Sequence, residues 1–411
     1  AARVTTLVLA TLPLFYGGAQ FANLDMLVAG LISACVLAGA DTVLRRARGE
    51  PWRASSVLTG VLAALGILAK GLIGLALPGV VLALWLILRR DGRGFLALIW
   101  PPAILAFAVV AVPWCWLMQS RYPEFFNYFF VYQHFERFAG GGFNNQEAFW
   151  FYVPVLVGTA LPWSLWGLGV LRKPFWRAGA DTGGVRRLMA LWVAVVVVFF
   201  SIPASKLVGY VMPALPPLAF LLAEAVRESV ERDGPGSMRH GRRAFIAFGV
   251  AMLIGVVAVV VTTLNPNRIS AKGIGEAMRD AMAPGDTLVM LHSYAWDLPF
   301  YSRARKPAWV VDNWDDPEIP RHDSWRKELL DASRFDPSVR VLISAGEWKA
   351  RVCGGREDAR YWVWGEPRDV EQYPLLAGTP PYASGKQNVV WRLDANAAFK
   401  QRVCGETPTG G

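Results

Sequence analysis

Long apolar runs alternate with short polar segments along roughly the first two thirds of the chain. Each run is close to the roughly 20 residues that an α-helix needs to cross a hydrocarbon core about 30 Å thick. The pattern therefore predicts a polytopic α-helical membrane protein with about nine spans. The runs cover residues 4–19, 25–44, 54–69, 71–88, 95–117, 148–170, 187–203, 207–226 and 244–264.

One apolar stretch, Ala54–Leu88, can be interpreted in two ways. It is apolar except for Lys70, so it can form one long helix or two shorter helices that meet near Lys70 and Gly71. A single helix would place the basic loops before and after it on opposite sides of the membrane, whereas a hairpin places both on one side. Because cytoplasmic loops concentrate lysine and arginine, we predict the hairpin.

The basic residues then divide unevenly between the two sides. The loops on one side carry seventeen lysines and arginines, and the short segments on the other side carry four. This asymmetry assigns the first side to the cytoplasm and predicts that Asp25, the loop 118–147 and all residues after 265 lie outside. The four are Lys70, Arg121, Arg137 and Lys206; the seventeen are Arg45, Arg46, Arg48, Arg53, Arg89, Arg90, Arg93, Arg172, Lys173, Arg177, Arg186, Arg187, Arg227, Arg232, Arg239, Arg242 and Arg243.

The character of the sequence changes after residue 265. Charges of both signs appear, and short runs rich in β-branched residues alternate with helix-like stretches such as Trp325–Ser333. We predict a membrane domain at 1–265 and a soluble α/β domain at 266–411. The predicted strands are Thr287–Leu291, Ala308–Val311, Val341–Ser344 and Val389–Leu393.

Composition agrees with a membrane protein. Hydrophobic residues make up 54% of the chain and charged residues 18%, and the mean hydropathy is +0.32, which excludes an ordinary soluble protein. The net charge of +10 is explained by membrane orientation, so we predict no nucleic-acid partner.

The sequence opens on Ala1 and not on Met, and we take the N-terminal spans to be missing. Of the four cysteines, Cys353 and Cys404 lie in the polar part and are the candidate disulfide pair.

Three polar residues near the predicted outer face are candidates for chemistry. Asp25 lies at the start of a span, where a carboxylate can act as a general base or can simply cap the helix. Lys70 interrupts the apolar hairpin and can bind a phosphate or extend to the interface. Lys206 is accompanied by Tyr210, so that a cation and a hydroxyl occur together.

The predicted outer loop between Gln119 and Glu147 is rich in aromatic residues and fits a segment that rests on the membrane surface. An interfacial anchor explains its aromatic residues but not the close spacing of His134, Glu136 and Arg137. His134 and Glu136 are candidates for acceptor or divalent-metal contact, although one His and one Glu are weak evidence for a metal.

Four stretches with this order and spacing resemble the GT-C class of membrane glycosyltransferases, which includes the lipid A aminoarabinose transferases and the bacterial relatives of protein O-mannosyltransferases. The resemblance covers roughly residues 1–265. The stretches are Asn23–Met26, Leu68–Gly71, the run from Tyr128 through Phe138 to Tyr152, and Ser205–Lys206 with Tyr210.

This resemblance implies an inverting transfer of a sugar from a polyprenyl phosphate to a hydroxyl of lipid A, a glycan or a protein, at the outer face of a bacterial inner membrane. Lys70, Arg137, Lys206 and Tyr210 are then candidates for donor phosphate and lipid binding, and Asp25 matches the family's second acidic position. The family's principal carboxylate lies after the first span, upstream of this chain's first residue, so the truncation would leave the chain inactive alone.

Two other functions fit many spans and intramembrane lysines. A transporter or flippase of a lipid-linked substrate is one, although such proteins more often have related halves or broken spans in matching positions. A membrane-anchored binding module, in which residues 266–411 do the work, is the other.

Overall fold

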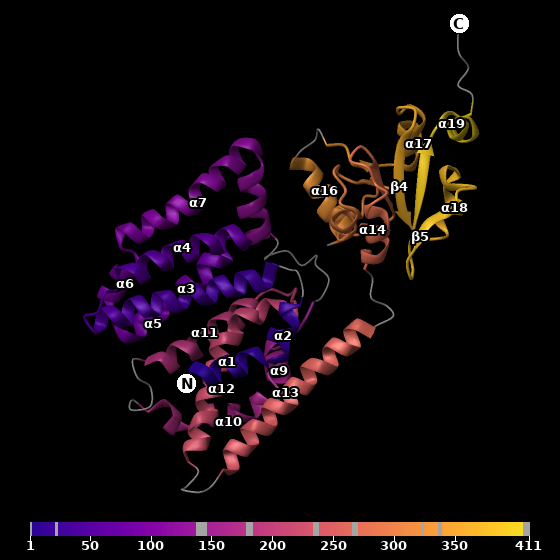
Figure 1. Ribbon diagram of the computed structural model, residues 1–411. Helices are drawn as coiled ribbons and strands as arrows, with labels where there is room; N and C mark the ends of the chain where they lie inside the picture. Colours follow the sequence, from indigo (N-terminus) through magenta and orange to yellow (C-terminus); the bar gives the residue numbers. More distant parts are fainter. Residues whose placement is uncertain are drawn as a thin grey trace. The chain divides into compact units, whose positions relative to one another are not determined.

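The structure is a computed structural model that describes residues 2–20, 24–136, 146–177, 184–232, 238–264, 270–322, 324–335 and 339–405. The chain divides into two compact units, Ala1–Leu264 and Asn265–Gly411. The first unit is helical and the second contains a β-sheet (Figure 1).

The helices of the first unit follow the apolar runs of the sequence. Two of the predicted spans appear as shorter pieces: the run 4–19 forms two helices separated before Pro13, and the run 148–170 bends by 107° between α9 and the segment that follows it. The elements are α1 (Ala2–Ala10), α2 (Pro13–Ala19), α3 (Leu24–Ala47), α4 (Arg53–Lys70), α5 (Ile73–Arg89), α6 (Gly92–Leu98), α7 (Pro101–Arg121), η1 (Asn127–Glu136), α9 (Tyr152–Thr159), η2 (Trp163–Trp166), α10 (Gly167–Val170), η3 (Lys173–Trp176), α11 (Val185–Ser201), η5 (Val208–Ala214), α12 (Leu215–Glu231) and α13 (Arg239–Leu264).

Within the described ranges, five helical segments are long and apolar enough to cross a membrane, or six if the bent segment counts as one span. Two further helices, α5 and α11, have 17 residues each. The prediction of a polytopic helical membrane protein is thus confirmed in its coarse form. The five segments are Leu24–Ala47, Arg53–Lys70, Gly92–Arg121, Val208–Glu231 and Arg239–Leu264.

The stretch Ala54–Leu88 is a hairpin of α4 and α5, as the distribution of basic residues predicted. Two glycines permit the close contact of its arms: a Cβ built on Gly74 would lie 2.2 Å from the backbone of Gly66. Small residues commonly allow such close approach of membrane helices. The turn uses Gly71, whose φ of 84° favours glycine.

The basic loops gather at one end of the helical unit. Arg46 on α3 lies 3.4 Å from Asp91, so the loops that follow α3 and α5 are neighbours. The indole of Trp85 donates to the carbonyl oxygen of Gly184 at 3.2 Å, which brings the segment before α11 to the same end. Arg186 connects that segment to Glu228 of α12 at 2.6 Å.

Arg186 is buried among these loops, with 2% of its side chain exposed. Its guanidinium donates to Glu224 and Glu228 at 2.6 Å each and to the carbonyl oxygen of Phe175 at 2.7 Å. It also lies 4.2 Å from the centre of the Phe175 ring. One arginine therefore fixes η3, α11 and α12 to one another.

The second unit is built on a six-stranded sheet with the order β3-β2-β1-β4-β6-β5. The first four of these strands run parallel, β6 runs antiparallel to β4, and β5 runs antiparallel to β6. The strands are β1 (Thr287–Leu291), β2 (Trp309–Val311), β3 (Leu342–Ile343), β4 (Ala359–Gly365), β5 (Pro381–Ser384) and β6 (Val389–Ala395); the helices are α14 (Lys272–Arg279), α15 (Leu298–Ser302), α16 (Trp325–Phe335), α17 (Ala345–Cys353), α18 (Asp369–Gln372) and α19 (Ala397–Cys404).

Alternate side chains of the central strands enter two separate apolar cores, one on each face of the sheet. Val289 and Val363 belong to one core, whereas Leu288 and Trp362 belong to the other. Helices cover a sheet of this kind on both faces, which explains why the buried parts of β1 and β4, Leu288–Leu291 and Tyr361–Trp364, are apolar. A disulfide between Cys353 and Cys404 joins the ends of α17 and α19.

Candidate functional site

Three residues that the sequence singled out meet at the end of the helical unit opposite the basic loops. Asp25 lies in the first turn of α3, Lys70 is the last residue of α4, and Tyr210 lies in η5. The ammonium of Lys70 donates to the carboxylate of Asp25 and lies 5.0 Å from the centre of the Tyr210 ring. We call this cluster the Asp25–Lys70–Tyr210 site.

The helices favour both charges of this ion pair. The start of a helix carries partial positive charge, which stabilises the carboxylate of Asp25, and the end of a helix carries partial negative charge, which stabilises the ammonium of Lys70. The side chains are 17% and 32% exposed, respectively. A ligand can therefore reach the pair, and an anion near Lys70 would compete with Asp25 for the ammonium.

Residues that the sequence analysis did not single out support this site. A Cβ built on Gly209 would lie 3.0 Å from an oxygen of Asp25, so glycine leaves room for the carboxylate beside η5. The ring of Tyr210 stacks on Phe200 of α11 with centres 5.3 Å apart. The hydroxyl of the buried Tyr152 donates to the carbonyl oxygen of Leu207 at 3.1 Å. Tyr152 ends the aromatic run that carries part of the family resemblance, but the sequence analysis gave it no role in the site.

Lys206 is close in sequence to Tyr210 but has a different environment. It is 3% exposed, and its ammonium donates to the carbonyl oxygens of Pro203 at 2.6 Å, Glu147 at 2.8 Å and Ala204 at 3.5 Å. These contacts account for its three N–H donors. Phosphate binding by Lys206 stays a prediction, because these contacts suit a residue that fixes the segment at Glu147 to the segment before η5.

Replacing Lys206 with methionine is expected to lower the free energy of unfolding by about 2–3 kcal/mol, because the charged hydrogen bonds from this buried side chain to the backbone are lost. Donor binding and stability should fall together, since the change acts through the position of the backbone. Thermal unfolding and lipid binding of one detergent preparation measure both. Unchanged thermal stability with lost lipid binding would show instead that Lys206 contacts the phosphate.

The remaining candidates of the outer loop are described only in part. The backbone of His134 and Glu136 belongs to η1, but their side chains lie outside the described residues, as does all of Arg137. Among the side chains that are described, no group of three or more His, Cys, Asp or Glu could hold a metal ion. Metal binding by His134 and Glu136 therefore stays a prediction.

The sheet unit contains its own cluster of polar side chains at the carboxyl ends of two neighbouring strands. His292 follows β1 and lies 2.7 Å from the hydroxyl of Tyr373 through Nε2 and 3.5 Å from Asp312 through Nδ1. Burial, with Asp369 and Asp312 nearby, raises the pKa of Tyr373 to about 12. The phenol is therefore protonated at neutral pH and forms a hydrogen bond with Nε2 of His292, while Nδ1 faces Asp312.

Sequence comparisons relate this chain to glycosyltransferases. Residues 1–129 match the family described as dolichyl-phosphate-mannose-protein mannosyltransferase. An undecaprenyl phosphate-α-4-amino-4-deoxy-L-arabinose arabinosyl transferase from Erwinia tasmaniensis is 32% identical over 266 residues, which are 63% of this chain and 46% of the relative. A transferase of the same description from Pseudomonas fluorescens, numbered 2 in its name, is 30% identical over 59% of this chain and 43% of its own length. The matched region thus spans less than half the length of these curated relatives.

A solved structure shares the fold over nearly the whole chain. The crystal structure of ArnT from Cupriavidus metallidurans bound to undecaprenyl phosphate aligns with a TM-score of 0.72 and 22% identity, covering 97% of this chain and 79% of that chain. Its apo form aligns with a TM-score of 0.68. These likenesses confirm the resemblance to GT-C membrane glycosyltransferases, including the sheet domain that follows the membrane helices.

Proposed function

We propose that this chain transfers a sugar from a polyprenyl phosphate to a hydroxyl of a cell-envelope acceptor. The observation that carries the proposal is the Asp25–Lys70–Tyr210 site, where a base, a cation and a phenol meet at partly exposed helix ends. The named ligand of the structural neighbour, undecaprenyl phosphate, supports a polyprenyl phosphate as donor. The aminoarabinose transferases among the relatives support aminoarabinose as the sugar. We take lipid A as the acceptor from the resemblance to the lipid A aminoarabinose transferases.

Lys70 is the residue that holds the donor phosphate in this proposal. The leaving polyprenyl phosphate gains negative charge in the transition state, and a fixed cation stabilises that charge. Lys70 is already oriented by its contacts with Asp25 and Tyr210. The aromatic ring beside the ammonium also provides an apolar surface for the first isoprene unit of the lipid.

Asp25 is the general base. The acceptor oxygen attacks the anomeric carbon, the bond from that carbon to the phosphate oxygen breaks, and the hydroxyl proton passes to the carboxylate of Asp25. Attack from the face opposite the phosphate inverts the configuration of the sugar. When the phosphate takes over Lys70, the carboxylate of Asp25 is released from its ion pair and is free to accept the hydroxyl proton.

We also infer that the chain crosses a bacterial inner membrane nine times, with the site and the sheet unit on the periplasmic side. Residues 1–265 then form the membrane glycosyltransferase domain and residues 266–411 the periplasmic domain. The gathering of basic loops at one end of the helical unit supports this orientation. Reporter fusions after residues 232 and 405 test it, because the inference requires them to lie in opposite compartments.

Transport of a lipid-linked substrate is the alternative that the sequence left open. The matched family and the relatives described above are named transferases, so they favour transfer over transport. A flippase would move the labelled lipid between leaflets without forming a glycosidic bond, which separates the two functions in reconstituted vesicles.

A transfer assay with a Lys70→Ala variant tests the proposed function. The purified full-length protein in vesicles receives undecaprenyl phosphate-aminoarabinose, labelled in the sugar, and lipid A. We expect labelled lipid A with the unaltered protein and about 10- to 100-fold less with Lys70→Ala, because a charged contact to the phosphate is lost. Lys173→Ala, an exposed lysine of η3 at the basic end, is the control. Equal activity of all three proteins would remove Lys70 from the site.

A further inference from the structure

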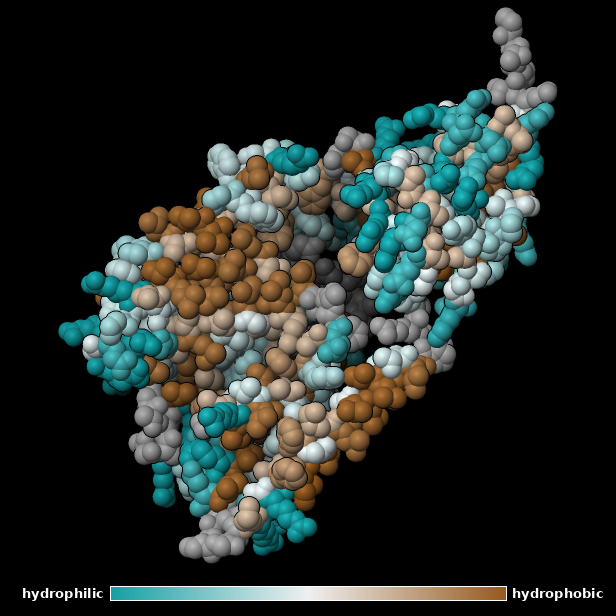
Figure 2. Space-filling model, viewed as in Figure 1, coloured by the Kyte–Doolittle hydropathy of each residue, from teal (hydrophilic) through white to brown (hydrophobic). Residues whose placement is uncertain are grey.

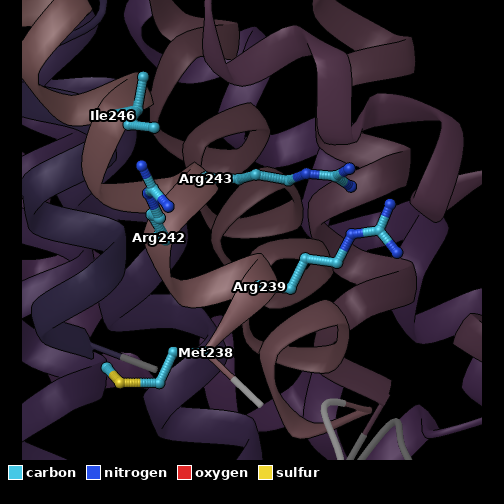
Figure 3. Close-up of a pocket in the computed structure, with 5 residues that line it drawn as sticks. All are labelled: Met238, Arg239, Arg242, Arg243 and Ile246. Atoms are coloured by element: carbon cyan, nitrogen blue, oxygen red, sulfur yellow. The ribbon is translucent and has the colours of Figure 1, made fainter.

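A pocket at the start of α13 is lined by basic and apolar side chains. Its volume is about 500 Å³, and its lining consists of Met238, Arg239, Arg242, Arg243 and Ile246. Met238 directly precedes α13, and the other four residues are related by spacings of three or four, such as Arg239 to Arg243 and Arg242 to Ile246, so they lie on one side of the helix. Arg239 and Arg243 point the same way from the helix, one turn apart (Figure 3).

The three arginines of this pocket are not neutralised by the described residues around them. Neighbouring arginines at the same end of the unit do have carboxylate partners: Arg227 contacts Glu231 at 2.5 Å and Arg232 contacts Glu228 at 3.2 Å. No ion pair of Arg239, Arg242 or Arg243 with a described residue exists. The pocket therefore has an excess of positive charge.

Most of the surface of the helix that continues from this pocket is apolar and exposed. In the most apolar 18-residue window of α13, only 11% of the residues are buried. Phe245 and Ile246, directly beyond the arginines, are 76% and 53% exposed. Figure 2 shows the corresponding change along α13, from a hydrophobic surface to hydrophilic residues at the end where the helix begins. The pocket thus lies where α13 leaves the apolar layer.

We propose that this pocket binds the headgroup phosphate of an anionic phospholipid, whose acyl chains lie along the exposed apolar side of α13. Guanidinium groups bind phosphate oxygens through paired hydrogen bonds. Basic side chains at the edge of a membrane span attract anionic lipids. Met238 and Ile246 at the rim match the glycerol and upper acyl region of a lipid, which free phosphate lacks. A zwitterionic lipid would leave the excess charge of the arginines uncompensated.

Lipid binding to the purified protein tests this proposal. The protein in detergent is titrated with phosphatidylglycerol or with phosphatidylcholine of the same acyl chains, and bound lipids are counted by native mass spectrometry. We expect one phosphatidylglycerol to bind in preference to phosphatidylcholine. In the triple variant Arg239→Gln, Arg242→Gln and Arg243→Gln, the affinity for phosphatidylglycerol should fall about 100-fold, the combined effect of three arginines at an anionic surface.

A second triple variant serves as the matched control. Arg90, Arg93 and Arg172 are exposed and lie at the same end of the unit, so replacing them with glutamine removes equal charge outside the pocket. Its phosphatidylglycerol affinity should stay within about threefold of that of the unaltered protein. An equal loss in both variants would show a general charge effect and overturn the proposal. Displacement of the lipid by millimolar inorganic phosphate would identify a free-phosphate site and overturn the assignment to a lipid.

Discussion

Replacing Asp25 with asparagine is expected to lower the rate of sugar transfer by about 100- to 1,000-fold, the usual contribution of a general base. Donor affinity should not fall, because the change removes a negative charge beside the phosphate and releases Lys70 from its carboxylate partner. Turnover measured at saturating donor, together with lipid affinity from native mass spectrometry, separates the two effects.

Asp41→Asn is the matched control for this prediction. Asp41 lies on the same helix, α3, but pairs with Arg45 at the basic end, 2.7 Å away. Its replacement should leave transfer within about twofold of normal, as for a surface ion pair. If Asp25→Asn lowered donor affinity and turnover by the same factor, Asp25 would be a structural residue at the start of α3 and not the base.

Replacing Arg186 with methionine is expected to lower the free energy of unfolding by about 3 kcal/mol, the lower end of the cost of removing one partner from a buried ion pair. The loss is at the lower end because Glu224 keeps Arg227 at 3.0 Å and Glu228 keeps Arg232 at 3.2 Å. Glu224 and Glu228 would both lose a contact of 2.6 Å. The side chain of methionine fills much of the vacated volume, so the loss reports mainly on charge. Unfolding of the detergent-solubilised protein by increasing denaturant measures the change.

The control for Arg186 is its neighbour Arg187, whose side chain is exposed. Arg187→Met should change stability by less than about 1 kcal/mol. A variant in which Arg186, Glu224 and Glu228 are all replaced by apolar residues should recover most of the lost stability, because no buried charge is then left unpaired. A stable Arg186→Met protein would show that Arg227 and Arg232 alone are enough to stabilise the two carboxylates.

The helical part of the fold was predictable because the membrane requires long apolar helices. The distribution of basic residues even predicted the hairpin of α4 and α5. Sequence alone did not reveal that α1 and α2 are separate helices or that the segment around α9 bends by 107°. Such breaks depend on tertiary packing, for example the 2.9 Å hydrogen bond from the indole of Trp163 to the hydroxyl of Thr11.

In the sheet unit, four strands were predicted close to their observed positions, and β4 and β5 were missed. The run Tyr361–Trp364 in β4 has the residues typical of strands, so its signal was present. The exposed β5 at the edge of the sheet has a weak apolar pattern. Edge strands depend on pairing with a neighbour, here β6, and sequence alone does not provide that information.

The sequence indicated most of the candidate site but not its contacts. Asp25, Lys70 and Tyr210 stood out because each is a polar group beside an apolar run, and the structure brings them together. Lys206 stood out for the same reason, yet its ammonium is directed at backbone carbonyl oxygens. Hydropathy reveals which polar groups are unusual, but only the fold determines what each of them contacts.

The most direct test of donor binding at the Asp25–Lys70–Tyr210 site is native mass spectrometry of the detergent-purified protein with undecaprenyl phosphate. We expect one bound undecaprenyl phosphate on the unaltered protein and on Lys173→Ala, and an affinity about 10- to 100-fold lower for Lys70→Ala, because the charged contact to the phosphate is missing. Equal affinity of Lys70→Ala and the unaltered protein, or no binding to either at excess lipid, would contradict the proposed donor site.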